Sequence, residues 1–347
     1  AHSASYGFGK IASTFGLDKP IRNSNDIRLV FYHGIGDKSS PCMQFLSDEL
    51  NEQVFSQQID YLSERYEFIS LEDITSKTPP PRLNKKPLCS ISFDDGLSTV
   101  YSKAFPILAE KGIPFTVFLN TNVINNSNLL WLHSLSYLFS TYGAKSVIKS
   151  INEFLQPSQK ITYSNFAEVE AWFRSNIEYL MDIDLLGSIE SKNAIEKQKI
   201  AQEENLYLTW EQIDEMHSNG VTFYSHTHRH FPLNSFSDCS KITSEISLAK
   251  EILSKHKASS DCSFISFPFG MEVDYGARAI KYALQAGHKY IVEVGDGLNS
   301  ETRISNNKLI SRVGLGNVNS HSPSLYTAIE VWPIVKSKLK AYKRIFS

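Results

Sequence analysis

Short apolar runs alternate with amphipathic stretches along most of the chain, and this alternation predicts strands followed by helices. We expect strands over 27–32, 68–71, 88–93, 115–119, 221–224, 264–267, 290–294 and 309–313. Apolar residues at helical spacing predict helices over 45–66, 101–111, 210–219, 240–256 and 277–286. Helices between successive strands make the strands parallel, and right-handed crossovers place each one beside its predecessor. The pattern therefore predicts an α/β fold in the form of a distorted (β/α) barrel.

Residues 122–205 interrupt this alternation. They begin with an asparagine-rich polar stretch and continue with helical periodicity over 131–139, 144–154, 166–181 and 188–202. We interpret 122–205 as a helical insertion at the active face of a single catalytic domain that takes in 1–347, because insertions there shape access to a barrel's site. A last helix is expected over 323–347. Its lysines predict a solvated face, with a weak membrane-surface contact as the alternative.

Composition is that of an ordinary globular protein, since 41% of the 347 residues are hydrophobic and 21% are charged. The net charge of −2 gives no reason to expect a nucleic-acid partner, and no apolar run approaches the ~18 residues of a membrane span. The four cysteines form no CxxC pair, and Cys89 is expected as a buried free thiol. This slightly favours the cytoplasm, whereas two disulfides or a signal peptide removed before Ala1 would indicate a secreted or periplasmic protein. Neither composition nor charge indicates an oligomeric state.

Two adjacent carboxylates, Asp94 and Asp95, stand where the apolar run 88–93 ends, and Gly96 follows them. In an α/β fold, sites form at the carboxyl ends of parallel strands. The pleat breaks at a strand end, so both carboxylates can reach one pocket although strand neighbours point to opposite faces. The alternative is an ordinary polar turn, since Asp and Gly are common turn formers.

A second segment supplies nitrogen ligands. Thr209 and Gln212 have the spacing of a capping box, which predicts a helix that leads into the strand over 221–224. His226, His228 and His230 follow that strand, so three of the chain's 10 histidines fall within five positions. Neutral imidazole is the commonest protein ligand of zinc, and two histidines with one carboxylate and an open position are typical of a catalytic metal site. The carboxylates and histidines together indicate metal-assisted hydrolysis.

These residues resemble the motifs of the NodB-type polysaccharide deacetylases, known as carbohydrate esterase family 4. Ser92-Phe93-Asp94-Asp95-Gly96 resembles the first motif of that family, and His226-Thr227-x-x-His230 resembles the second. The segment 264–270 resembles the third motif in a form that lacks its usual arginine. The resemblance covers about 27–120 and 205–315. It implies the NodB-type barrel and a NodB homology domain.

The resemblance implies a role for each matched residue. Asp95, His226 and His230 would bind a divalent metal, with zinc as the expected ion, and Asp94 would be the general base. His228 would be exposed or beside the site and is not assigned as a ligand.

Three further residues carry weaker assignments. Tyr32-His33 resembles the motif that comes first in the circularly permuted branch of the family, which would make His33 the general acid; by itself it is equally well a core or turn histidine. Phe269 follows Pro268, where the family uses a backbone amide to stabilise the oxyanion. Arg312 would replace the missing arginine and hold Asp94 ionised, with a surface salt bridge as the alternative.

By resemblance, the reaction is removal of an N-acetyl group from an aminosugar in a polysaccharide, oligosaccharide or lipid-linked glycan. A deformylase or related amide hydrolase acting on a modified sugar is the alternative enzyme, and a catalytically silent glycan-binding barrel is the alternative of another class. Aromatic residues of the insertion could stack on sugar rings, but burial in the core is the preferred interpretation. These residues are Trp131, Tyr137, Tyr142, Trp172 and Phe173. His133 has the same ambiguity and is given no role.

Overall fold

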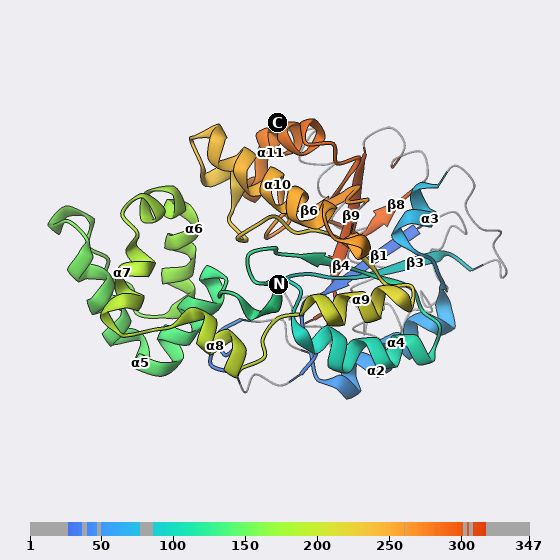
Figure 1. Cartoon of the computed structure of the whole chain (residues 1–347), viewed down its shortest axis with the longest axis horizontal. Coiled ribbons are helices and arrows are strands. Elements are labelled where there is room, and N and C mark those ends of the chain that lie inside the picture. The colour runs from blue at the N-terminus through green and yellow to red at the C-terminus, as the bar shows by residue number, and fades with distance from the viewer. Residues whose placement is uncertain are drawn as a thin grey trace, which may run out of the picture.

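Seven parallel strands form a closed barrel (Figure 1). The structure is a computed structural model, and it describes residues 27–36, 40–46, 50–76, 86–259, 261–300, 304 and 308–316. The strands are β1 (Ile27–Tyr32), β3 (Leu88–Phe93), β4 (Phe115–Leu119), β5 (Thr222–Ser225), β6 (Phe264–Ser266), β7 (Tyr290–Val294) and β9 (Leu309–Gly314). They pair in the order β3-β4-β5-β6-β7-β9-β1, and β1 pairs with β3 along its whole length, which closes the barrel. The expected (β/α) barrel is confirmed.

Two short strands make the barrel irregular. β2 (Glu67–Phe68) pairs with the start of β3, and β4 pairs with the later residues of β3. β8 (Leu298–Asn299) runs antiparallel to the start of β1. These additions lie at the end of the barrel where β1 and β3 begin, so they leave the carboxyl ends of the strands open.

Along the strands, the barrel interior is first apolar and then polar at their carboxyl ends. One buried cluster takes an apolar residue from each of several strands, among them Phe118, Tyr224, Phe264 and Ile310. Two positions further along three of these strands stand His226, Ser266 and Arg312. Residues two apart in a strand share a face, so these polar side chains form the next layer above the apolar one. The alternation of side chains along each strand thus places polar groups inside the barrel at the carboxyl ends of the strands.

Helices cover the barrel on both sides (Figure 1). On one side lie α2 (Glu52–Arg65), α4 (Phe105–Glu110) and α9 (Trp210–Ser218), and on the other lie α10 (Cys239–Ser254) and α11 (Glu272–Gln285). The short α3 (Leu71–Thr75) follows β2, and a π-helical turn, Val100–Ala104, leads into α4. Large apolar side chains of α2 and α9, such as Phe55 and Ile213, share one buried cluster with the outer face of the strands. Their burial is what holds these helices against the barrel.

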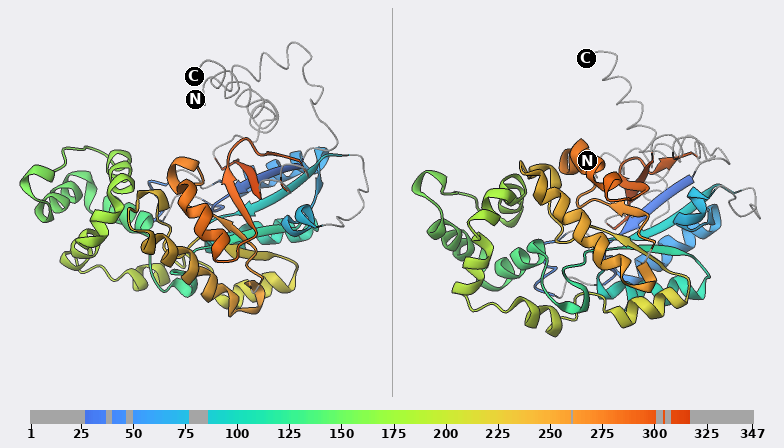
Figure 2. Two further views of the ribbon diagram at one scale, coloured as in Figure 1. Left: turned by 90° about the horizontal axis from the view of Figure 1, so that it is seen from above. Right: turned by 45° about the horizontal axis from the view of Figure 1, so that its top comes forward.

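The insertion forms a helical lobe beside the barrel, and both views of Figure 2 show it apart from the strands. It contains α5 (Trp131–Phe154), α6 (Phe166–Asp182), α7 (Leu185–Lys192) and α8 (Lys197–Glu203). The lobe is joined to the barrel by packing, because its Trp131 and Phe173 belong to the same buried cluster as Phe231 and Phe267 of the barrel loops. The helical insertion expected over 122–205 is confirmed.

Several expected bounds are wrong, each for a local reason. The helix expected from residue 45 begins at Glu52, because Leu50 bridges to Ile35 and Asn51 caps the helix by accepting from the Gln53 amide at 2.8 Å. The strand expected over 68–71 is only β2, since α3 starts at Leu71.

The helices of the insertion agree with the prediction in part. The two helices expected over 131–139 and 144–154 are confirmed, because α5 is interrupted at Gly143, whose backbone is not helical (φ +75°). The helix expected over 188–202 is two, α7 and α8, because Ala194 between them has a left-handed φ of +53°. The helix expected from 277 is confirmed as the part of α11 that follows the non-helical Gly276 (φ +66°), and a short turn from Glu272 precedes it.

Other expectations are confirmed. β4 and β7 have the expected bounds, and the capping box of Thr209 and Gln212 forms at the start of α9. All four cysteines are free, and Cys89 is buried in β3. Among the described residues, no helix has both the length and the apolar composition to cross a membrane. The segments 1–26 and 323–347 lie outside the described residues, and the expected C-terminal helix with them.

Candidate metal centre and active site

Asp95, His226 and His230 meet at the carboxyl ends of β3 and β5. Each offers one ligand atom, and these atoms lie within 4.8 Å of one another. Nε2 of His230 is 3.3 Å from Oδ1 of Asp95, and Nε2 of His226 is 3.5 Å from the same oxygen. All three side chains are buried. One carboxylate and two imidazoles facing a common point are a donor set that fits a divalent metal ion.

The backbone at these ligands is unusual. Asp95 (φ +68°), Thr227 (φ +69°) and His230 (φ +61°) all have left-handed conformations, which residues other than glycine rarely adopt. Gly96 is also left-handed, and a Cβ there would lie 2.9 Å from Cδ2 of Leu119. The reversal at Asp95 breaks the strand pleat, so Asp94 and Asp95 both line one cavity. Such strain persists where the surrounding structure overdetermines it, and it gathers at functional sites.

Hydrogen bonds hold the ring of His226 and the backbone carbonyl of His230. Nδ1 of His226 is 2.8 Å from the carbonyl oxygen of Ser266, which can only accept, so Nδ1 carries the hydrogen and Nε2 presents its lone pair to the cluster. Burial lowers the pKa of His226 to about 4 and the pKa of His230 to about 3, so both rings are neutral near pH 7. Nε1 of Trp131 donates to the His230 carbonyl at 2.9 Å, which ties the insertion to this ligand.

Arg312 reaches Asp94 from β9 with both terminal nitrogens. The N–O distances are 2.7 and 2.5 Å, and Arg312 also donates to the hydroxyls of Ser92 and Ser266 at 3.2 and 2.5 Å. The arginine has 0% of its surface exposed, and its guanidinium lies 4.3 Å from the centre of the Phe31 ring. The alternative of a surface salt bridge is therefore wrong.

This pair sets the charge of Asp94. Burial alone raises the pKa of Asp94, but the Arg312 guanidinium, its hydrogen bonds and His226 outweigh burial and bring the pKa down to about 2. Asp94 is therefore ionised at neutral pH, beside the cluster and 3.9 Å from Nε2 of His226. It stands close to Asp95, His226 and His230 but does not belong to the group whose ligand atoms meet.

A cavity of about 540 Å³ lies over these residues, within the about 300–1,000 Å³ that is typical of small-molecule sites. His33, at the end of β1, lines its wall and meets the Phe31 ring edge-on, with centroids 5.6 Å apart. Phe269 also lines it, with a left-handed φ of +63° and its ring 5.0 Å from that of His230. The structure thus gathers every residue predicted for the site around one cavity, and His228, which was not assigned to the site, lies outside it.

The insertion contributes cavity residues that the sequence interpretation missed. Arg174 of α6 lies 3.9 Å above the Phe269 ring and donates to Asp274 at 2.5 Å, so it connects the insertion to the loop after β6. His133 of α5 also lines the cavity. His133 is the one histidine of 122–205, and that rarity was the available signal. The cavity that the His133 side chain faces could not be predicted from helical spacing, because α5 presents different residues to two cavities.

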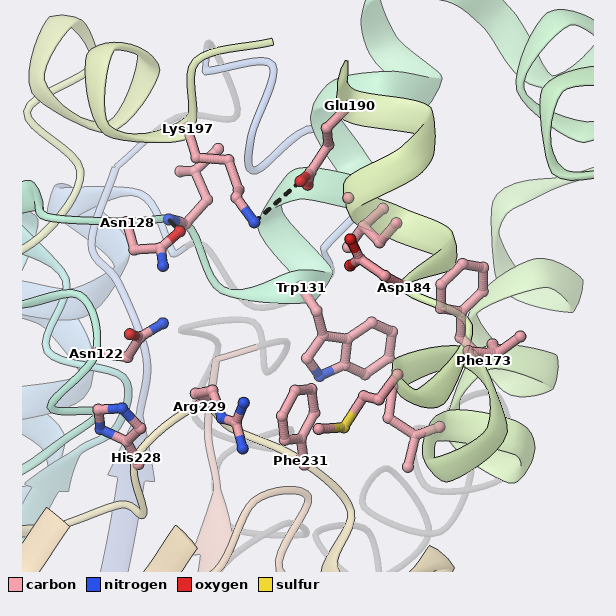
Figure 3. Close-up of a pocket in the computed structure, with 16 residues that line it drawn as sticks. Asn122, Asn128, Trp131, Phe173, Asp184, Glu190, Lys197, His228, Arg229 and Phe231 are labelled. Carbon is pink, nitrogen blue, oxygen red and sulfur yellow. Dashed lines mark hydrogen bonds and ion pairs between the residues drawn. The ribbon is translucent and has the colours of Figure 1, made fainter. Parts of the chain in front are cut away.

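The second cavity, of about 420 Å³, is formed by neighbouring residues of the same segments (Figure 3). Trp131 stands at its centre, and Arg229 and Phe231 come from the loop that also holds the histidine ligands. The Lys197–Glu190 ion pair (2.9 Å) closes one side, and Arg229 is held by the buried Glu245 at 2.6 Å. Its cationic side chains are therefore already neutralised by carboxylates.

The other assignments for the insertion are decided by burial. Trp131 and Phe173 are buried and stacked with centroids 6.0 Å apart, which confirms core positions for them. Tyr142 is exposed, so the core prediction is wrong there. His228 is half-buried, and its Nδ1 lies 2.8 Å from the Thr121 hydroxyl. None of the five aromatic residues considered for sugar stacking lines the cavity over Asp95, His226 and His230.

Comparison with known proteins gives matches of sequence and of fold. A family model described as polysaccharide deacetylase matches residues 82–291. A poly-β-1,6-N-acetyl-D-glucosamine N-deacetylase of Staphylococcus epidermidis is 34% identical over 145 residues, 37% of this chain and 49% of that protein. The chain thus spans about half the length of the curated relative that it matches.

Two solved structures share the fold. The Streptococcus pyogenes deacetylase PplD, in complex with acetate, aligns with a TM-score of 0.54 and 18% identity over 90% of this chain and 99% of that one. IcaB from Ammonifex degensii aligns with a TM-score of 0.51 and 15% identity over 88% and 97%. The assignment to the circularly permuted branch stays a prediction. The match over residues 82–291, which includes both carboxylates and both histidines, shows that this chain belongs to the polysaccharide deacetylase family.

Proposed function

We propose that the chain is a metal-dependent hydrolase that removes acetyl groups from N-acetylated aminosugars of a glycan. The observation that carries the proposal is the buried Asp95, His226 and His230 cluster beside an ionised Asp94, under a cavity of about 540 Å³. Family membership supports the reaction class, and the name of the Staphylococcus epidermidis relative supports N-acetylglucosamine as the sugar.

Asp95, His226 and His230 are the residues that would hold the metal, and zinc is the ion we expect. When bound, such an ion polarises the acetyl carbonyl and makes a water molecule more acidic. Both rings are neutral near pH 7, and the hydrogen on Nδ1 of His226 leaves the lone pair of its Nε2 directed at the common point. The ligand set needs no rearrangement of the loop to form.

Asp94 is the proposed general base. Arg312 holds the carboxylate of Asp94 in one orientation and keeps it ionised. The same interaction makes Asp94 a weaker base, since its pKa of about 2 lies far below the working pH. Water adds to the acetyl carbon, Asp94 takes the water's proton, and the bond from the acetyl carbon to the sugar nitrogen breaks. The products are acetate and a free amine.

His33 and Phe269 complete the proposal. His33 follows β1, the strand paired with the one that carries Asp94, and it lines the same cavity, where it donates a proton to the leaving amine. Phe269 lines the cavity with a left-handed backbone, and the amide of this turn after β6 is the proposed donor to the oxygen that becomes negative when water adds. Arg174 above the Phe269 ring keeps this turn in place.

The test is metal content together with acetate release. We expect about one equivalent of zinc in the wild type after reconstitution, and acetate release from oligomers of β-1,6-linked N-acetylglucosamine that stops on chelation. His230→Ala loses the metal and the activity, while His217→Ala, a histidine of α9 outside the cavity, keeps both. A wild type that binds no metal after reconstitution would make a catalytically silent glycan-binding barrel the better interpretation.

A second variant tests the base. Asp94→Asn preserves the shape of the side chain and removes its ability to accept a proton, so it keeps the metal and loses about 100-fold or more in kcat. Retained turnover in Asp94→Asn would refute this role.

A further inference from the structure

The geometry points to His133 as a substrate-binding residue that donates a hydrogen bond from Nε2 to an oxygen of the bound sugar. This inference rests on the proposed function, because it takes the cavity over the metal cluster as the sugar site. It assigns the insertion a direct part in recognition.

His133 is held rigidly at the cavity wall. It lies in the first turn of α5, has 2% of its surface exposed, and lines the cavity together with Leu130 and Leu132. In the same turn, Trp131 faces the second cavity and donates to the His230 carbonyl. This turn is therefore fixed to the ligand loop, and the imidazole of His133 has a defined position relative to the metal cluster.

A chain of two hydrogen bonds decides which ring nitrogen carries the hydrogen. The backbone N–H of Leu130 donates to the hydroxyl oxygen of Tyr207 at 3.0 Å, and Nδ1 of His133 lies 2.5 Å from the same oxygen. Tyr207 is buried, so its own hydrogen needs an acceptor, and among the described residues that acceptor is Nδ1 of His133. Tyr207 therefore donates to Nδ1.

The remaining hydrogen of the neutral ring must then be on Nε2. Burial lowers the pKa of His133 to about 3, so the ring carries one hydrogen at working pH. Nε2 makes no hydrogen bond to any residue in the described ranges, and the ring lines the cavity. The neighbouring wall is apolar, with Met43, Phe45 and Phe166. A fixed N–H in such a wall selects a ligand that offers an oxygen acceptor at that point, as a sugar does and an aliphatic group does not.

The kinetic test compares two substitutions at one position. His133→Leu removes the donor and is expected to lower kcat/KM by about 10- to 100-fold, mostly through KM, with metal content unchanged. His133→Gln places an amide N–H close to the position of Nε2, so it should recover a substantial part of that loss. Tyr275→Phe is the control for the Tyr207→Phe variant used below. It also removes a buried tyrosine hydroxyl, one that donates to Glu293 at 2.6 Å outside the cavity, and it should keep wild-type kinetics.

A spectroscopic test needs no turnover. In ¹⁵N-labelled zinc-loaded protein, the His133 ring, assigned by its loss in His133→Gln, should have a protonated Nε2 and a bare Nδ1. Tyr207→Phe should abolish this preference, and adding the N-acetylglucosamine oligomer should shift the Nε2 resonance but not that of His217. A protonated Nδ1 in the wild type, or wild-type kinetics in His133→Leu, would overturn the inference. A wild type with no deacetylase activity but with the expected spectrum and shift would instead refute the proposed reaction alone.

Discussion

Replacing Arg312 tests how the site controls the charge of Asp94. In the wild type the pKa of Asp94 is brought from 3.8 to about 2, although burial opposes this change. Arg312→Met keeps much of the side-chain volume and removes the charge, which leaves burial as the dominant effect. Buried carboxyls without a partner have pKa values raised by up to about 3–5 above their usual value. We therefore expect the apparent pKa of Asp94 in Arg312→Met to rise above 3.8, into the range where activity is measured.

The assay is the pH dependence of kcat/KM for Arg312→Met and the wild type, expressed as their ratio. Both enzymes lose metal when His226 and His230 become protonated, and the ratio cancels that shared loss. The ratio should fall by about tenfold for each pH unit below the raised pKa of Asp94. Arg312→Lys, which keeps the charge but not the paired geometry, should give a smaller fall. The argument would be refuted if the ratio of kcat/KM in Arg312→Met to that in the wild type stayed constant from pH 8 down to the lowest pH at which the metal still binds.

The remaining predictions concern stability and metal affinity. The Arg312–Asp94 pair should contribute about 2 kcal/mol to stability, which is present above pH 3.8 and lost as the pH falls through about 2; acid unfolding of wild type and Asp94→Asn would measure it. Trp131→Phe removes the hydrogen bond to the His230 carbonyl and should weaken zinc binding by about 10-fold in a competition titration, whereas unchanged affinity would exclude a role for this contact. Gly96→Ala should lower the thermal midpoint more than Gly112→Ala, because both glycines are left-handed but only Gly96 would place its Cβ against another side chain; equal effects would contradict the steric argument.

The strand ends were predictable because the signal is local. An apolar run that stops at Asp94 and Asp95, and another that stops before His226, each places its polar residues at a carboxyl end. The carboxyl ends of all parallel strands lie on the same side of a barrel, so assigning the strands was enough to predict that the two carboxylates and the histidines lie on one face. The helix bounds were predictable where a glycine marks the break, as at Gly143, and not where Ala194 takes a left-handed backbone between α7 and α8.

The sequence by itself determined the barrel, the insertion and the residues that can bind metal, because period-two and helical patterns state which side chains share a face. Only the tertiary structure decided which side chains meet across long separations. Arg312 bonds Asp94 over 218 positions because β9 and β3 both flank β1 when the barrel closes. His133 reaches the cavity because the first turn of α5 packs on the loop after β5. Closure and docking depend on how whole faces fit together, and no local pattern contains that information.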